Sequence, residues 1–347
     1  MNSPFSVKLS ICFNPPYLDP MPAARINKVI IASCAVWPQY CILVYSKLNH
    51  IILYNKGEFI SRGYEKKYRQ NTPIMKESKR ILFISQQIYP FLDTETPIRM
   101  RNRQMPEYFQ SHGFETRTFM PKFGEINERR NQLHEVIRLS GINLIVSDSD
   151  HPLLIKVASI QSARIQIYFI DNDDYFHRRK GVLDADGNEY KDNDERCIFF
   201  ARGVLETVKK LRWTPDIICC SGWMSALVPL YVRRAYADTP FFENSKLVTL
   251  LDDDEYQVPF SSKFSEKLLV GDMMQTDVRS VAGLPVAYED LMHLAIDYSD
   301  ALVQVSPTIN SRLLNYAQNR GKNVMPYSAE EDKAEFMAFC NSLLLEE

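Results

Sequence analysis

Short apolar runs alternate with polar and amphipathic stretches between about residue 80 and residue 305. The runs are near-continuous in apolar residues, which is typical of strands covered on both faces. The predicted strands are Arg80–Ser85, His112–Phe119, Ile142–Val146, Ile165–Ile170, Ile217–Cys220, Leu247–Leu251 and Ala301–Val305. This spacing predicts βαβ crossovers and an α/β fold, with a Rossmann-like parallel sheet and helices on both faces.

One helix is predicted from an apolar stripe with three- and four-residue spacing. The stripe consists of Cys197, Ala201, Val204, Val208 and Leu211, and it predicts a helix over residues 194–211. A second helix is predicted over residues 330–345. Because ligands of such sheets bind at the carboxyl ends of the strands, the loops after Ser85, Cys220 and Leu251 are the expected location of the functional site.

The first 74 residues lack this regular patterning, which begins abruptly after Met75. We therefore expect three parts: an N-terminal extension over residues 1–74, a Rossmann-like domain over 75–320 and a helical tail over 321–347. The abrupt change also suggests the hypothesis that Met75 is the biological start. The uncharged run from Val29 to Ser46 could indicate a membrane span, but Pro38 and Gln39 interrupt it, and we do not expect the chain to enter a membrane.

Composition narrows the function classes. The chain has 41 basic and 43 acidic residues and a formal charge of -2, so it lacks the cationic surplus of nucleic-acid binders. Its 7 cysteines are scattered, which favours free thiols in a reducing cytoplasm over a disulfide framework. Cys219 and Cys220 are adjacent in a predicted strand and would point to opposite faces, so they cannot bind one metal ion together.

Several segments, in order, resemble the starch/glycogen synthase family from about Arg80 to Thr308. They are Ile81–Ser85 with Tyr89–Phe91, Met120–Gly124, Tyr168–Asn172, Asp192–Asn193 with Arg196 and Phe199–Phe200, Pro215–Ile218, Trp223, Ala226–Tyr231, Tyr256–Gln257 and Tyr298–Thr308. The resemblance implies one half of a GT-B glycosyltransferase, which transfers glucose from ADP-glucose to α-1,4-glucan in glycogen biosynthesis. It implies that this half binds the glucan, that the other half holds most of the ADP-glucose, and that no cofactor is needed.

The family's phosphate loop, K-x-G-G-L, is replaced here by residues 93–97, of which Asp93, Glu95 and Thr96 are the main changes. The replacement removes a cation, adds two carboxylates and removes flexible glycines. Like charges 4 Å apart repel by about 4 kcal/mol at an effective dielectric constant near 20. Weakened ADP-glucose binding is therefore expected; the alternative is that these residues form a solvated acidic loop without a function.

The family's H-D-W-H-T element corresponds to Ser221–Ser225, in which only Trp223 persists. By resemblance, Trp223 is a candidate substrate-binding residue together with Tyr89 and Tyr256, although Trp223 could instead only pack beneath the loop. The family's I-H-N-L-A-Y-Q element corresponds to the acidic segment 251–257.

The resemblance therefore gives four altered cleft positions: Ser221, Gly222, Asp252 and Asp253. The acidic run at 252–254 could attract a divalent cation, but consecutive acidic residues are more often a solvated loop, so no metal is predicted. The segment 184–192 also lacks the ligand spacing of an EF-hand and is interpreted as a turn-rich connection.

The second Rossmann-like domain is expected to be absent beyond Thr308, which leaves two main hypotheses. The chain is a glucosyltransferase of reduced activity, alone or paired with a separate chain or a second copy, or it is a non-catalytic protein that binds glucan or regulates another enzyme. A third hypothesis is that the fold serves an unrelated ligand.

Overall fold

The computed structural model describes residues 78–328 and 333–345, together with four strands near the N-terminus. Two compact units are present, Met1–Lys76 and Glu77–Glu347. In the first unit, strands β1 (Val29–Ser33), β2 (Cys41–Tyr45), β3 (Ile51–Asn55) and β4 (Glu58–Ile60) form an antiparallel sheet. The uncharged run thus contributes two strands, and its other residues lie outside the described part. No helix among the described residues has the length and hydropathy needed to cross a bilayer.

The second unit is built on a 10-stranded sheet. The strands that follow one another across it are β14 (Asn323–Met325), β13 (Ala301–Gln304), β12 (Lys246–Leu251), β11 (Ile217–Ser221), β5 (Arg80–Ser85), β6 (Glu115–Pro121), β10 (Ile165–Asp171), β9 (Ser149–Ile160) and β7 (His134–Glu135). From β14 to β10 all neighbours are parallel. The predicted fold class is therefore confirmed.

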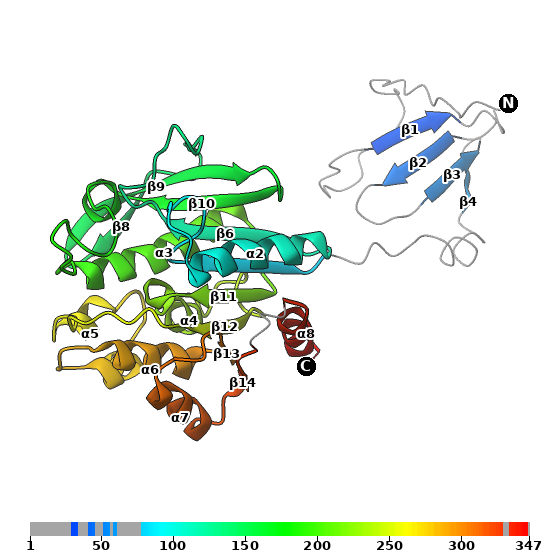
Figure 1. The fold of residues 1–347 in the computed structure, drawn as a ribbon. Helices are drawn as coiled ribbons and strands as arrows, with labels where there is room; N and C mark the ends of the chain where they lie inside the picture. Colours follow the sequence, from blue (N-terminus) through cyan, green and yellow to red (C-terminus); the bar gives the residue numbers. More distant parts are fainter. Residues whose placement is uncertain are drawn as a thin grey trace. The chain divides into compact units, whose positions relative to one another are not determined.

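Helices cover both faces of this sheet (Figure 1). On β5, Ile81 and Phe83 join one core cluster with α2 (Pro97–Ser111) and α8 (Lys333–Leu343), while Leu82 and Ile84 join the other. The second cluster contains α3 (Asn193–Leu211), α4 (Val228–Arg233) and α6 (Tyr288–Tyr298), and α7 (Ser311–Asn319) lies against α6. Alternation along each strand thus builds two cores. Cys219 and Cys220 follow the same rule and lie buried, as free thiols, in opposite clusters.

Two predictions about strands need correction. The run Ile142–Val146 forms β8, but it pairs antiparallel with β9 and is not one of the parallel strands. The long strand β9 was not predicted, because polar and charged residues such as Asp150, His151 and Lys156 interrupt its apolar positions. The strand β14 lies within residues 321–347, where a helical tail was expected, and it extends the parallel sheet.

Candidate functional site

The order of the strands reverses direction at β5, which has β6 on one side and β11 on the other. The register aligns Ser85 with Ser221 of β11, and Ser221 with Leu250 of β12. The three loops that were predicted to carry function therefore start side by side. In open α/β sheets the carboxyl edge at such a reversal is the usual ligand crevice, so we describe this crevice as the candidate site.

Gly222 begins the loop after β11 with a backbone φ of 87°, a conformation that glycine adopts readily. The turn brings Trp223 under the loop after β12, where its ring lies 5.3 Å from that of Tyr256 and 5.8 Å from that of Phe260. Trp223 is only 2% exposed. In this conformation it packs beneath the loop, and its ring is not open for stacking on a sugar.

Asp252 is buried at the end of β12 and forms an ion pair with Arg101 of α2. Arg101 also donates a 3.3 Å hydrogen bond from Nη1 to the carbonyl oxygen of Val305. Burial raises the pKa of Asp252, and the nearby guanidinium only partly offsets this effect. Beside the pair, the hydroxyl of Ser221 donates to Asn102 Oδ1 at 2.9 Å. The two family cleft positions Ser221 and Asp252 are therefore tied to α2.

Asp254 joins the loops on both sides of the crevice. Its Oδ2 accepts the backbone N–H of Trp223 at 2.8 Å, and its Oδ1 accepts the hydroxyl of Tyr288 at 3.2 Å. The carboxylate is enclosed, although the residue as a whole is partly exposed. Burial, and then the negative charge of Asp252, raise the pKa of Asp254 to about 7. The hydrogen bonds from Trp223 and Tyr288 act in the opposite direction and offset only part of this rise in pKa.

The remaining residue of the acidic run, Asp253, is exposed and accepts the hydroxyls of Ser306 and Thr308. The three consecutive carboxylates thus have three separate sets of partners. Among the described residues, these three carboxylates do not gather their oxygens into a group of metal-ligand type.

The altered phosphate loop follows β5 at the same edge of the sheet. Asp93 and Glu95 are exposed, and Asp93 forms a 2.8 Å ion pair with Arg130. Arg99 donates to the carbonyl oxygen of Thr94 at 3.0 Å. These two arginines partly neutralise the loop, so the repulsion toward a phosphate is smaller than the sequence alone suggested.

Thr96 has a structural role in that loop. Its hydroxyl accepts the backbone N–H of Arg99 at 3.3 Å and caps α2, and Pro97 occupies the first helical position. The third predicted aromatic residue, Tyr89, is partly exposed and lies 5.6 Å from the guanidinium of Arg103.

Replacing Thr96 with alanine is expected to lower the free energy of unfolding by about 1 kcal/mol, because the first turn of α2 loses its cap. Urea denaturation followed by circular dichroism measures this change. Thr94→Ala, at an exposed position two residues earlier, is the matched control and should change stability by less than about 0.5 kcal/mol. Equal losses in the two variants would show that Thr96 is not a functional cap.

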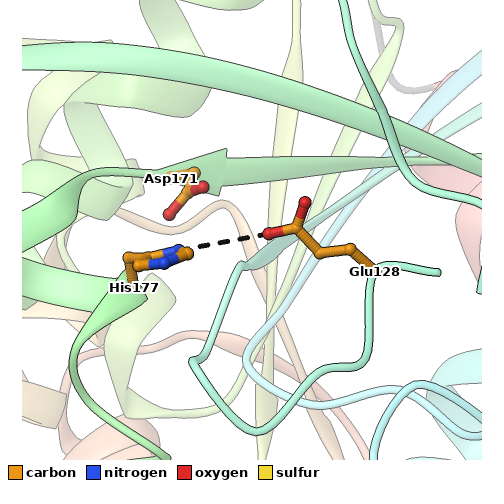
Figure 2. A group of neighbouring side chains, drawn as sticks. All are labelled: Glu128, Asp171 and His177. Atoms are coloured by element: carbon orange, nitrogen blue, oxygen red, sulfur yellow. Dashed lines mark ion pairs between the residues drawn. The ribbon is translucent and has the colours of Figure 1, made fainter.

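A group of metal-ligand type lies at the carboxyl ends of β6 and β10 (Figure 2). Atoms of Glu128, Asp171 and His177 lie within 4.8 Å of one another. Lys122 and Lys156 each place Nζ 2.7 Å from Glu128 Oε1, and Lys156 also lies 2.9 Å from Asp171 Oδ2. A divalent ion would be repelled by both ammonium groups, so the lysines themselves supply the positive charge of this network.

Three further residues of the crevice were not predicted from the sequence. Gln86 accepts the Met224 N–H through Oε1 at 3.3 Å, and Arg101 and Tyr288 hold the acidic run. Arg101 and Tyr288 come from helices, where a charged or aromatic residue gives no signal that it will be buried against a loop far along the chain.

The fold and the crevice define a Rossmann-like α/β domain, one half of the GT-B arrangement. The catalytic domain of starch synthase IV from Arabidopsis thaliana, solved with ADP and acarbose, matches the fold with a TM-score of 0.57 and 16% sequence identity. The match covers 72% of this chain and 51% of the plant chain.

Comparison of the amino-acid sequence with known proteins identifies the family to which the chain belongs. Residues 80–343 match the starch synthase catalytic domain, and the chain belongs to this family. The glycogen synthase of Chlorobium luteolum is 34% identical over 228 residues, which is 65% of this chain and 45% of that protein. The glycogen synthase of Pelodictyon phaeoclathratiforme is 31% identical over 265 residues, or 76% and 53% of the two chains. The chain thus spans about half the length of these curated relatives.

Proposed function

We propose that this chain binds α-1,4-glucan at the carboxyl edge of its sheet and transfers glucose from ADP-glucose slowly or not at all. Family membership supports a glucan ligand, since the relatives are glycogen synthases. Tyr89, which is partly exposed in the loop after β5, offers an aromatic face with a polar hydroxyl at that edge.

One observation supports a low rate of glucosyl transfer. The hydrogen-bond donors and the cation of the crevice are already paired with acceptor groups of the same chain. Glucosyl transfer leaves a diphosphate with additional negative charge, which must be stabilised by cations and N–H groups that are free to receive it. Asp254 accepts the Trp223 N–H, Gln86 accepts the Met224 N–H, and Asp252 pairs with Arg101. A pyrophosphate would have to compete with these acceptors and with the charge of the two aspartates.

The test measures both activities on one preparation of the full chain. We expect the chain to co-sediment with glycogen, and incorporation of radiolabelled glucose from ADP-glucose to stay at the level of a heat-denatured sample. Turnover in the ordinary enzymatic range of about 1 s⁻¹ or more would overturn the proposal. If the chain shows neither retention nor turnover, the fold serves a different ligand. Gel filtration of the same sample shows whether two copies pair.

A matched pair of variants locates the glucan site. Tyr89→Ala is expected to weaken retention roughly fivefold, about 1 kcal/mol, because an exposed aromatic face is lost. Tyr108→Ala is the control, since Tyr108 lies near the other end of α2, away from the carboxyl edge. Equal retention by both variants would remove Tyr89 from the site.

A further inference from the structure

The loop after β12 covers the one aromatic residue of the H-D-W-H-T element that persists in this chain. Residues 253–258, which we call the lid, follow Asp252 and end before Phe260. Phe260 is fixed by paired backbone hydrogen bonds with Val286, of 2.9 and 3.0 Å. Beneath the lid lies Trp223, with Tyr256 inserted beside it. Phe260 also lies against the Trp223 ring, so movement of the lid would expose the side of the ring that Tyr256 covers.

The lid is attached largely through carboxylates. Asp254 holds it to the Trp223 N–H and to Tyr288. On the opposite side, Glu189 accepts the N–H groups of Gln257 and Val258 at 2.8 and 2.7 Å. The lid itself contributes exposed Glu255, Gln257 and Val258 to the surface. The buried side chain of the lid is Tyr256, which stacks on Phe260 at 4.3 Å and donates to the carbonyl oxygen of Val286 at 3.1 Å, so release of the lid has to break these contacts as well.

The charges that face Asp254 favour its neutral form. From its own segment, Asp252 is the negative charge that raises the pKa of Asp254, whereas Asp253 and Glu255 are exposed and Asp253 is held by Ser306 and Thr308. The guanidinium of Arg101, from α2, is already paired with Asp252, and α6 presents the neutral hydroxyl of Tyr288. The loop after β5 presents Gln86, which is uncharged, and the loop after β11 presents the Trp223 N–H. The enclosed carboxylate therefore meets more negative than positive charge.

We propose that Asp254 latches the lid while it carries a proton, and that loss of this proton releases the lid and makes Trp223 accessible to an α-glucan. The glucan part rests on the proposed function, whereas the movement of the lid does not. In the neutral form the proton lies on Oδ1 and is donated to Tyr288 Oη, whose own proton goes to the carbonyl oxygen of Asp252 at 3.3 Å. Oδ2 still accepts the Trp223 N–H, without the desolvation of a charge or repulsion from Asp252. An ionised group is more stable in solvent, so deprotonation shifts the equilibrium toward the open lid.

The direction of the pH effect follows from the linkage between proton binding to Asp254 and opening of the lid. The closed lid raises the pKa of Asp254 to about 7, whereas a solvent-exposed aspartate titrates near its ordinary value of 3.8. Between these two values the closed state binds more protons than the open state, so the closed state loses stability relative to the open one as pH rises. Because the closed state itself loses its proton around pH 7, the open population increases about tenfold from pH 6 to pH 8 and levels off above that range.

Hydrogen exchange of the full chain tests this movement without any ligand. After correction for the intrinsic pH dependence of exchange, the amides of Trp223 and Met224 should exchange about tenfold more often at pH 8 than at pH 6. Asp254→Asn, a permanently neutral side chain of the same shape, should remove this rise. Glu255→Gln is the matched control, because it removes one charge from the lid without contacting Trp223, and it should behave like the unchanged protein.

The outcomes separate the inference from the proposed function. If the Asp254→Asn variant retains the tenfold rise, or if Glu255→Gln abolishes it, the latch is refuted. Maltoheptaose titrations at pH 6 and pH 8 then test the glucan part. Tighter binding at pH 8 in the unchanged protein, lost in Asp254→Asn, supports it, whereas binding that is equal at both pH values refutes access through the lid. If maltoheptaose does not bind at either pH but the exchange result holds, the latch stands and the proposed function fails.

Discussion

Replacing Arg101 with methionine is expected to lower the free energy of unfolding by about 3–5 kcal/mol. Arg101 and Asp252 are both buried, and the guanidinium is the only cation that the described part of the structure places on this carboxylate. Without it, a buried carboxylate has to remain charged without a partner or take up a proton. The loops after β12 and β13 are also expected to loosen, because Arg101 holds the carbonyl oxygen of Val305.

Urea denaturation at pH 7 measures this loss, and two further variants explain its origin. Arg103→Met removes a partly exposed ion pair with Glu107 on the same helix and should cost less than about 1 kcal/mol. Adding Asp252→Leu to Arg101→Met should recover much of the stability, because the unpaired charge is then removed as well. If the double variant is as unstable as the single one, the loss comes from packing and not from the buried charge.

Replacing Gly222 with alanine is expected to be the second most damaging change, by about 2–4 kcal/mol. The φ of 87° disfavours any side chain, and an added Cβ would lie 2.8 Å from Cβ of Gln86 and 3.2 Å from Oδ2 of Asp254. The first contact is closer than two carbon atoms tolerate, so the loop after β5 or the latch at Asp254 would have to move. Amide exchange at Trp223 should therefore increase together with the loss of stability.

Gly187→Ala is the control for the conformational cost of placing a side chain at a positive φ. Gly187 has a φ of 83°, close to that of Gly222, but no atom lies within 4 Å of its added Cβ. Its replacement should therefore show only the conformational cost of about 1 kcal/mol. Thermal unfolding of both variants gives the difference directly. Equal losses would mean that the close approach of Gln86 and Asp254 does not constrain Gly222.

The parallel strands were predictable because strands that are buried on both faces consist of nearly continuous runs of apolar residues. Helix α3 was predicted from its stripe, with Cys197 and Val208 buried as expected. The strand β9 was not predictable in this way, since only five of its 12 residues are buried and Lys156 forms an ion pair with Asp171. The difference is physical: apolar periodicity reports burial against the core, and it carries little information where a strand is stabilised by charges.

The class of fold, the family and the sheet edge where three loops meet can all be inferred from the amino-acid sequence. The presence of acids in these loops, where the family has other residues, can be inferred from it too. What those acids do becomes clear only from the folded chain: Asp252 pairs with Arg101, Asp254 holds Trp223, and Asp93 pairs with Arg130. These partners are supplied by folding from distant positions in the chain. Because the effect of a charge depends on its burial and its neighbours, the sequence specified the acids but could not specify their roles.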